Sequence, residues 1–383
     1  MTLTSRPSAL ERRRVPLFDV LLVVATLVVS VIGVIMVYTA TRGSLLADGS
    51  DPKEFLKKQA LFVVLGVIVM VGLALFDYRR FEPIANLLYG LIILSLLAVF
   101  AVGSSAEGAA RWFTLGPLQL QPSEFAVIAL VLAIASYCDK RSEDGLAWRD
   151  VFRLLIMAGI PIVLVLLQPD LGTAMIMLIV LLVMLAVAGL PIRILVMLLA
   201  GTVLFALVAV ESGILHHYQI ARLTTFLNPN STSKNQYVQE AIYTTNQSKD
   251  AIGSGGLFGS GIGHGAQTNL GYVPEQQTDF IFTAVGEQLG FFGGVGLLVL
   301  LGVIAGRIWR AGTRSRDTFG RLICVGLFTF VAFSTFQNVG MTMGIMPITG
   351  IPLPFVSYGG TAVLVFFAAC GLALSVSARR RLR

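Results

Sequence analysis

The chain has 383 residues, of which 56% are apolar and 13% charged, and its mean hydropathy is +0.82. A soluble domain carries about 25% charged residues, so the composition excludes an ordinary soluble enzyme and indicates a polytopic membrane protein. The formal net charge of +7 does not point to nucleic acid, because most Lys and Arg lie in short loops between apolar runs, where they set membrane topology.

Ten apolar runs are each close to the ~20 residues that a helix needs to cross a bilayer. The sequence therefore predicts an all-α polytopic membrane protein with about ten transmembrane helices. Residues 1–383 form a single transmembrane domain with no soluble domain attached. The first run is too long for the core of a signal peptide, so we expect it to be retained. The predicted spans are 17–39, 58–76, 84–103, 122–138, 152–168, 170–188, 193–212, 279–306, 319–343 and 358–377.

The distribution of basic residues fixes the orientation of these spans. With the N-terminus and its Arg12, Arg13 and Arg14 in the cytoplasm, 20 of the 28 Lys and Arg residues face the cytoplasm. This excess satisfies the positive-inside rule and predicts cytoplasmic termini in a multi-pass protein of the cytoplasmic membrane. Eight basic residues remain outside: Arg42, Lys53, Lys57, Lys58, Arg111, Arg222, Lys234 and Lys249.

The outer connections carry most of the polar features. Residues 213–278, between spans seven and eight, form a large outer loop of 66 residues, which is far longer than a simple connection and is expected to be functional. Residues 104–121 hold Arg111 and Trp112 beside turn signals, and residues 344–357 contain three prolines and two glycines. We therefore expect the functional site on the outer face.

Cysteine and histidine do not indicate a metal or redox site. The three cysteines lie in or beside apolar runs without metal-ligand spacing, which is typical of ordinary helix residues. The three histidines are loop residues without catalytic partners in sequence, so we expect them to be structural. No Ser/His/Asp order and no HExxH motif is present, and no metal ligand is assigned. These six residues are Cys138, Cys324, Cys370, His216, His217 and His264.

A glycine-rich stretch precedes span eight. Seven of the thirteen residues in 253–265 are glycine, which permits positive φ angles and close backbone approach. Their amides could cradle a phosphate, although the stretch matches no nucleotide-binding fingerprint; the alternative is a flexible run that lets the outer loop approach its substrate. Pro274 and Glu275 are predicted to form the first turn of the following helix.

Asp279 has two interpretations. With a helix beginning at Pro274, it lies near the positive end of that helix. It is then either a helix-end carboxylate or a general base at the water–lipid boundary. The first interpretation includes a packing stripe of small residues below it, at Thr283, Gly286, Gly290 and Gly293.

Two further carboxylates and three cations are candidates for a binding site. Glu124 and Asp170 each begin a span, where a carboxylate either caps the helix or faces a site. Arg111, Arg222 and Lys249 lie in the outer loops. They are either solvated surface cations or partners for a diphosphate, for which the planar fork of arginine is well suited.

The sequence resembles the RodA/FtsW group, the SEDS proteins of bacterial cell-wall synthesis. The matching blocks follow the family order, with each falling in or beside an outer loop, and they extend over nearly the whole chain. They are 108–112 (GAARW), 121–124 (QPSE), 168–173 (QPDLGT), 247–256 (QSKDAIGSGG), 274–282 (PEQQTDFIF), 286–290 (GEQLG) and 347–360 (PITGIPLPFVSYGG).

The resemblance implies a peptidoglycan glycosyltransferase that polymerises lipid II on the outer face of the membrane. The essential aspartate of the family falls on Asp279, the expected base for the 4-hydroxyl of the acceptor sugar, and part of the active site falls in the outer loop 213–278. The leaving undecaprenyl diphosphate makes the reaction that of an inverting hexosyltransferase. The implied substrate-binding residues are Arg111, Arg222, Lys249, Glu124, Gln168, Asp170 and Glu275.

Further expectations concern the partners of the protein and the branch of the family that it resembles. The resemblance implies a class B penicillin-binding protein as transpeptidase partner, together with other elongation-complex proteins. The residues 350–360 (GIPLPFVSYGG), with Pro352, resemble the elongation (RodA) branch more than the division branch, which stays an alternative. Val127 and Ser260 stand where the family commonly has lysine. No cofactor is evident, and a divalent cation, Mg²⁺ or Mn²⁺, is an open option.

Two other classes of function compete with this one. A lipid II flippase would use the same spans and helix-breaking segments, but the polar groups cluster on one face and no inverted repeat is evident. A noncatalytic scaffold for the penicillin-binding protein is the third hypothesis.

Overall fold

The computed structural model describes residues 19–106, 109–115, 118–141, 146–211, 217–229, 233 and 235–379. The arginines at 12–14, His216, Lys234 and the basic tail 380–383 lie outside the described residues, as does Gly108 of the first matching block. The expectations for these positions stay predictions.

Ten helices coincide with the ten predicted spans, which confirms the fold class. Among the described residues, seven are long and apolar enough to cross a membrane, and α3, α6 and α7 are shorter apolar helices. The helices are α1 (Val20–Ala47), α2 (Glu54–Leu75), α3 (Ala85–Val102), α4 (Pro122–Asp139), α5 (Trp148–Leu167), α6 (Leu171–Val187), α7 (Ile192–Glu211), α11 (Ile281–Thr313), α12 (Thr318–Thr342) and α13 (Gly360–Arg379).

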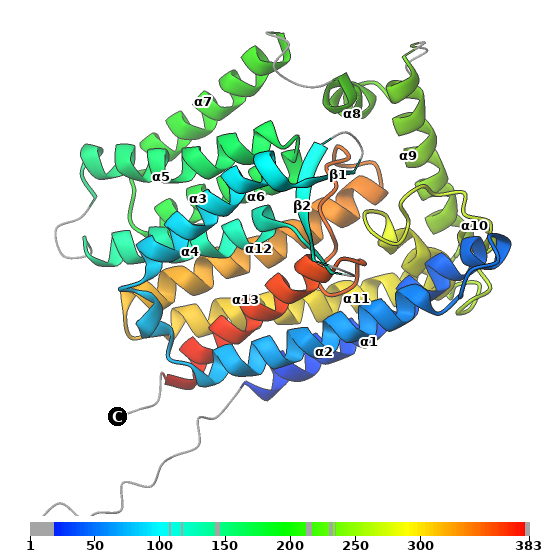
Figure 1. Cartoon of the computed structure of the whole chain (residues 1–383), viewed down its shortest axis with the longest axis horizontal. Coiled ribbons are helices and arrows are strands. Elements are labelled where there is room, and N and C mark those ends of the chain that lie inside the picture. Colours follow the sequence, from blue (N-terminus) through cyan, green and yellow to red (C-terminus); the bar gives the residue numbers. More distant parts are fainter. Residues whose placement is uncertain are drawn as a thin grey trace, which may run out of the picture.

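The core lies where α12 and α13 pack among α2, α4, α6 and α11. Nearly every residue of α13 is buried, whereas α2 exposes leucines and valines on its outer side. Hydrocarbon chains can solvate such apolar side chains, so only helices surrounded by others are buried on all sides. Figure 1 shows most of these helices running side by side, with α7 at the edge of the bundle.

The outer end of the bundle carries structure that the sequence pattern did not predict. Residues 104–106, 109–115 and 118–120 form a small antiparallel sheet in the order β1-β2-β3, and the described part of the outer loop contains three helices. In Figure 1 these helices lie at the end of the bundle opposite to the C-terminal end of α13. The outer elements are β1 (Ser104–Ala106), β2 (Ala109–Leu115), β3 (Leu118–Leu120), α8 (His217–Leu227), α9 (Gln236–Ser254) and α10 (Ala266–Asn269), and a 3-10 turn (Tyr78–Phe81) lies between α2 and α3.

The predicted start of this helix at Pro274 is wrong, because α11 begins at Ile281. Glu275 has a φ of 49°, in the left-handed region, which a right-handed helix cannot pass through. Its carbonyl oxygen accepts hydrogen bonds from the amides of Asp279 and Phe280 at 3.1 and 3.3 Å. Residues 274–280 are therefore a compact turn, and Asp279 lies two residues before the helix.

The glycine-rich stretch is packed against α11, so the prediction of a flexible run or a phosphate cradle is wrong for these residues. The amides of Ser260 and Gly261 donate to the carbonyl oxygens of Glu287 and Gln288 at 2.9 and 3.1 Å, and the amide of Gly263 donates to the Gln288 side chain at 2.8 Å. These amides are occupied and unavailable to phosphate. The stretch instead uses its glycines for close backbone contact with α11.

A buried carboxylate joins this region to the turn before α11. Glu287 is 2% exposed and accepts hydrogen bonds from the amides of Gln267 and Thr268 and from the Thr268 hydroxyl, at 2.6 to 2.9 Å. Gln276 donates to the hydroxyls of Thr268 and Thr283. Because buried carboxylates need such partners, Glu287 is a structural residue that holds α10 and the turn on α11.

Candidate active site

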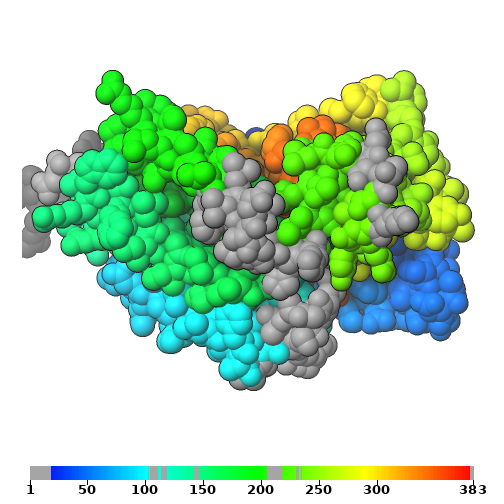
Figure 2. Space-filling view, turned by 90° about the horizontal axis from the view of Figure 1, so that it is seen from above, coloured from blue at the N-terminus to red at the C-terminus, as the bar shows by residue number. Residues whose placement is uncertain are grey.

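A cavity of about 1110 Å³ lies between the outer ends of the helices. Its wall is built from α2, α4, α6, α8, α9, α12 and α13, and from the connections before α11 and α13. Figure 2 looks down on α7 and α8, with later, orange parts of the chain visible in the hollow between them. The cavity therefore lies on the predicted outer side and reaches below the helix ends.

Asp279 and Arg222 approach each other across Gly350. A Cβ atom on Gly350 would lie 3.3 Å from Asp279 Oδ2 and 3.9 Å from Arg222 Nη1. Gly350 has a φ of +75°, so a side chain there would be strained as well as crowded. The absence of a side chain at this position lets a carboxylate and a guanidinium share one wall of the cavity.

Asn338 fixes the backbone on both sides of this meeting point. Its side-chain nitrogen donates to the carbonyl oxygens of Asp279 and Ile351, each at 2.8 Å, and the residue is fully buried. One amide therefore joins the turn before α11 to the connection before α13. This arrangement limits movement of the Asp279 carboxylate relative to Gly350.

Arg111 is held by the protein itself. Its Nε donates to the Gln168 carbonyl oxygen at 2.8 Å, and its Nη2 donates to the Pro169 carbonyl oxygen at 3.1 Å and to the Tyr218 hydroxyl at 3.2 Å. The Arg222 guanidinium lies over the Tyr218 ring, 5.4 Å from the ring centre. Tyr218 thus connects the two arginines, and much of the donor capacity of Arg111 is already in use.

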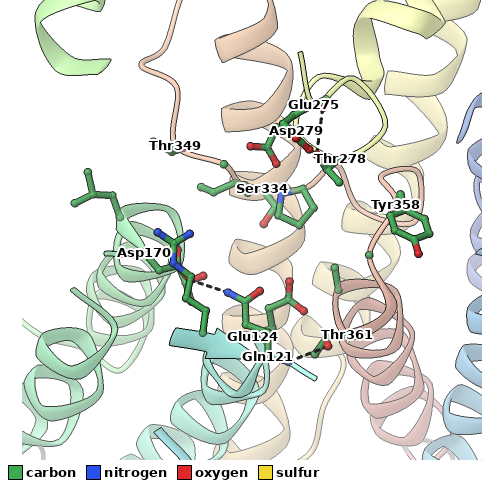
Figure 3. Close-up of a pocket in the computed structure, with 18 of the residues that line it drawn as sticks. Gln121, Glu124, Asp170, Glu275, Thr278, Asp279, Ser334, Thr349, Tyr358 and Thr361 are labelled. Carbon is green, nitrogen blue, oxygen red and sulfur yellow. Dashed lines mark hydrogen bonds between the residues drawn. The ribbon is translucent and has the colours of Figure 1, made fainter. Parts of the chain in front are cut away.

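A second polar group lies at the start of α4 and α6. Asp170 caps α6 by accepting from the Thr173 amide at 3.0 Å, and its other oxygen accepts from Gln121 and Ser123 at 3.1 Å. Glu124 lies in the first turn of α4, one residue after Ser123. Figure 3 shows Asp170 and Glu124 across the cavity from Asp279. Asp170 therefore caps α6 and also lines the cavity.

A neutral hydroxyl completes the rim on the α13 side. The Tyr358 ring packs edge-on against Phe55 at 4.8 Å, and its amide donates to the Gln277 carbonyl oxygen at 2.8 Å. Burial raises the pKa of the Tyr358 phenol, so it stays protonated at neutral pH. It can donate or accept a hydrogen bond without changing the charge of the site.

The structure brings six of the eight predicted site residues to the cavity wall. Glu275 is exposed at the rim, and the others are partly buried. Their individual roles stay predictions. The six residues are Arg111, Glu124, Asp170, Arg222, Glu275 and Asp279.

The other two predicted residues lie outside this cavity. Gln168 is 2% exposed, and its side chain donates to the Leu96 carbonyl oxygen at 2.9 Å. It therefore lies behind the cavity wall, and its role in substrate binding stays a prediction. Lys249 is exposed on α9 and lines a separate cavity of about 60 Å³ beside Gly344. Arg222 also lines this smaller cavity, so Lys249 lies near the site without lining it.

Sequence reasoning did not find Tyr218, Ser334 and Asn338. Each is one polar residue in an apolar or mixed helix, and nothing in its local pattern distinguishes it from a helix residue with a satisfied hydroxyl or amide. Tyr218 and Asn338 bond to residues more than 10 positions away along the chain, and Ser334 is brought to the cavity wall only by the packing of α12. The one signal available was the cost of polar groups at membrane depth.

The described part of the chain contains no group of three or more His, Cys, Asp or Glu residues arranged to hold a metal ion. Glu124 and Asp170 line the cavity, but Asp170 already accepts from three protein groups. The involvement of a divalent cation stays a prediction.

Comparison with known proteins adds an independent line of evidence. The family model FtsW/RodA/SpoVE, described as "Cell cycle protein", matches residues 19–382. "Probable peptidoglycan glycosyltransferase FtsW" of Trichlorobacter lovleyi is 33% identical over 376 residues, covering 95% of this chain and 94% of that protein. "Peptidoglycan glycosyltransferase MrdB" of Escherichia coli (strain K12) is 38% identical over 329 residues, covering 84% and 85%.

A solved structure has the same fold. One of its chains superposes with a TM-score of 0.78 at 29% identity, covering 96% of this chain and 99% of that chain. That structure describes the coordination of polymerization and crosslinking by a peptidoglycan synthase complex. The similarity extends over the helices and the outer region together.

Proposed function

This chain belongs to the FtsW/RodA/SpoVE (SEDS) family, and we propose that it is a peptidoglycan glycosyltransferase that polymerises lipid II on the outer face of the membrane. One observation carries the proposal. The Asp279 carboxylate lies beside the Arg222 guanidinium at Gly350, in the wall of a large cavity at the outer end of the helices. A carboxylate and a cation so placed match the needs of a glycosyl transfer with a diphosphate leaving group.

The proposed reaction uses Asp279 as general base. Its carboxylate takes the proton from the 4-hydroxyl of the acceptor sugar as that oxygen bonds to the anomeric carbon of the donor. The bond from this carbon to the diphosphate oxygen breaks, and undecaprenyl diphosphate leaves with the electron pair. Attack opposite the leaving group inverts the anomeric centre. The Arg222 guanidinium offsets the negative charge that develops on the diphosphate.

The proposal includes a transpeptidase partner. The similar solved chain belongs to a complex in which polymerization and crosslinking are coordinated. We infer that this chain likewise works with a class B penicillin-binding protein, which crosslinks the strands that it makes, alongside other elongation-complex proteins. If this chain and the penicillin-binding protein fail to co-purify in detergent, this part of the proposal is contradicted.

A polymerisation assay tests the activity. The purified chain with its partner, given fluorescent lipid II, is expected to form glycan strands that lysozyme digests. A parallel assay in vesicles measures lipid II translocation. Translocation without polymer would replace the glycosyltransferase proposal with a flippase.

The finer proposal is a role in elongation. It is supported by Pro352 in the segment before α13, whereas the relatives include FtsW and MrdB at similar identity. In a host depleted of its own elongation protein, expression of this chain is expected to restore rod shape. Restoration of septation in a division-depleted host, without rescue of rod shape, would assign it to the division branch.

A further inference from the structure

Three polar atoms in the cavity wall have no hydrogen-bond partner among the described residues. They are Glu124 Oε2, Ser334 Oγ and Thr349 Oγ1. Ser334 is fully buried and Thr349 is 9% exposed. Native proteins leave few buried polar atoms unpaired, because each one loses its water without compensation. The inner part of the cavity is therefore built to receive hydrogen bonds from a ligand.

All three residues line this one cavity. In the view of Figure 3, Ser334 lies between Asp279 and Glu124, with Thr349 at the side. They come from three different elements: the first turn of α4, the outer half of α12 and the connection before α13. This group is called the polar collar.

The cavity becomes apolar directly below the polar collar. Val127 lies three residues deeper than Glu124 on α4, and Phe330 lies four residues deeper than Ser334 on α12, so each shares a helix face with its polar neighbour. Phe330 stacks on Phe366 with ring centres 4.6 Å apart, and both line the cavity. A ligand in this region must be polar at the collar and apolar beneath it.

The side chains at the apolar end are buried. Val127 is 1% exposed, Phe366 2%, and Phe330 and Ile176 4% each. Because buried side chains are closely packed, we expect these walls to accept a short terminal group more readily than a longer one.

We propose that the polar collar and the apolar end form a subsite for the acetamido group of a lipid-linked amino sugar. Its N–H donates to Glu124 Oε2, its carbonyl oxygen accepts from the hydroxyls of Ser334 and Thr349, and its methyl group packs on Val127 and Phe330. This inference rests on the proposed function, because both sugars of lipid II carry an acetamido group at C2. It adds a determinant of substrate specificity to that function.

Acyl-chain analogues test the size of the subsite. Lipid II with a butanoyl group in place of one acetyl group is expected to react about 10-fold more slowly or worse, since two added methylenes must fit among the buried side chains of the apolar end. One analogue carries the change on the terminal sugar and another on the sugar next to the diphosphate. The sugar whose change reduces the rate is the one that the subsite holds.

Matched variants connect the effect to the subsite. Val127→Ala enlarges the apolar end and is expected to raise the relative rate with the butanoyl analogue at least 10-fold. Val131→Ala is the control, because Val131 lies one turn deeper on the same helix, is fully buried and does not line the cavity. Ser334→Ala is expected to weaken discrimination between acetylated lipid II and an analogue with a 2-hydroxyl group.

The outcomes separate this inference from the proposed function. Equal use of acetyl and butanoyl substrates by an active enzyme, or equal shifts in the Val127→Ala and Val131→Ala variants, would overturn the subsite alone. Absence of polymer from unmodified lipid II would overturn the proposed function. Affinity of the Asp279→Asn variant for the same lipids gives a binding readout that does not depend on turnover, so the subsite stays testable in that case.

Discussion

Replacement of Asp279 by asparagine is expected to lower the rate of lipid II polymerisation by about 10²- to 10⁴-fold, the range typical of a lost general base. Asparagine keeps the size of the side chain but cannot accept the proton of the attacking hydroxyl. The backbone of Asp279 stays held by Asn338, so the fold is expected to persist. The measurement is initial polymerisation rate at saturating lipid II, with thermal unfolding recorded on the same preparation.

Glu275→Gln is the control for this prediction. Glu275 lies four residues earlier in the same turn, lines the same cavity and is exposed, so the variant removes a nearby charge without removing the base. Because Glu275 is predicted to bind substrate, its loss is expected to raise KM, while the rate at saturating lipid II stays within a few-fold of the wild-type rate. A fully active Asp279→Asn protein, or equal losses in the two variants, would rule out Asp279 as the base.

Replacement of Gly290 by alanine is expected to destabilise the protein by about 3 kcal/mol or more, through backbone strain and overpacking. Gly290 has φ 68° and ψ −166°, a conformation that is essentially restricted to glycine. A Cβ atom there would also overlap the backbone of Gly259, Phe258 and Leu257. The glycine-rich stretch would have to leave α11, and the lost packing would reach the turn that carries Asp279.

Gly296→Ala is the matched control on the same helix. Gly296 has open space where a Cβ atom would lie, so alanine is expected to be neutral or to stabilise the helix by about 0.5–1 kcal/mol. Thermal unfolding in detergent, followed by size-exclusion chromatography, measures both variants. An unchanged melting temperature for Gly290→Ala would mean that the non-helical backbone at Gly290, within α11, is not required for the fold.

Several features could be predicted from sequence because they depend on local composition. A run of about 20 apolar residues has few alternatives to a transmembrane helix, so the ten helices lie close to the predicted spans. Asp170 at a helix start was also predictable, since a carboxylate there can cap free amides. The outer position of the polar loops, inferred from where basic residues lie, stays a prediction.

The start of α11 could not be predicted, because two influences oppose each other at residues 274–280. Pro274 favours the first turn of a helix, but Gln276 is buried through hydrogen bonds to Thr268 and Thr283. This tertiary contact holds a turn in which Glu275 adopts a positive φ. The glycine-rich stretch was misinterpreted for a related reason, since its partner on α11 lies about 30 residues later.

The sequence by itself determined the membrane class, the helices and the candidate residues on the outer side, because each depends on the properties of short segments. Only the tertiary structure decided which candidates meet. It placed Asp279 beside Arg222 at Gly350, bound Arg111 to the carbonyls of Gln168 and Pro169, and left Lys249 in a separate cavity. These outcomes depend on how helices far apart in the chain pack, which fixes distances that residue type and spacing do not encode.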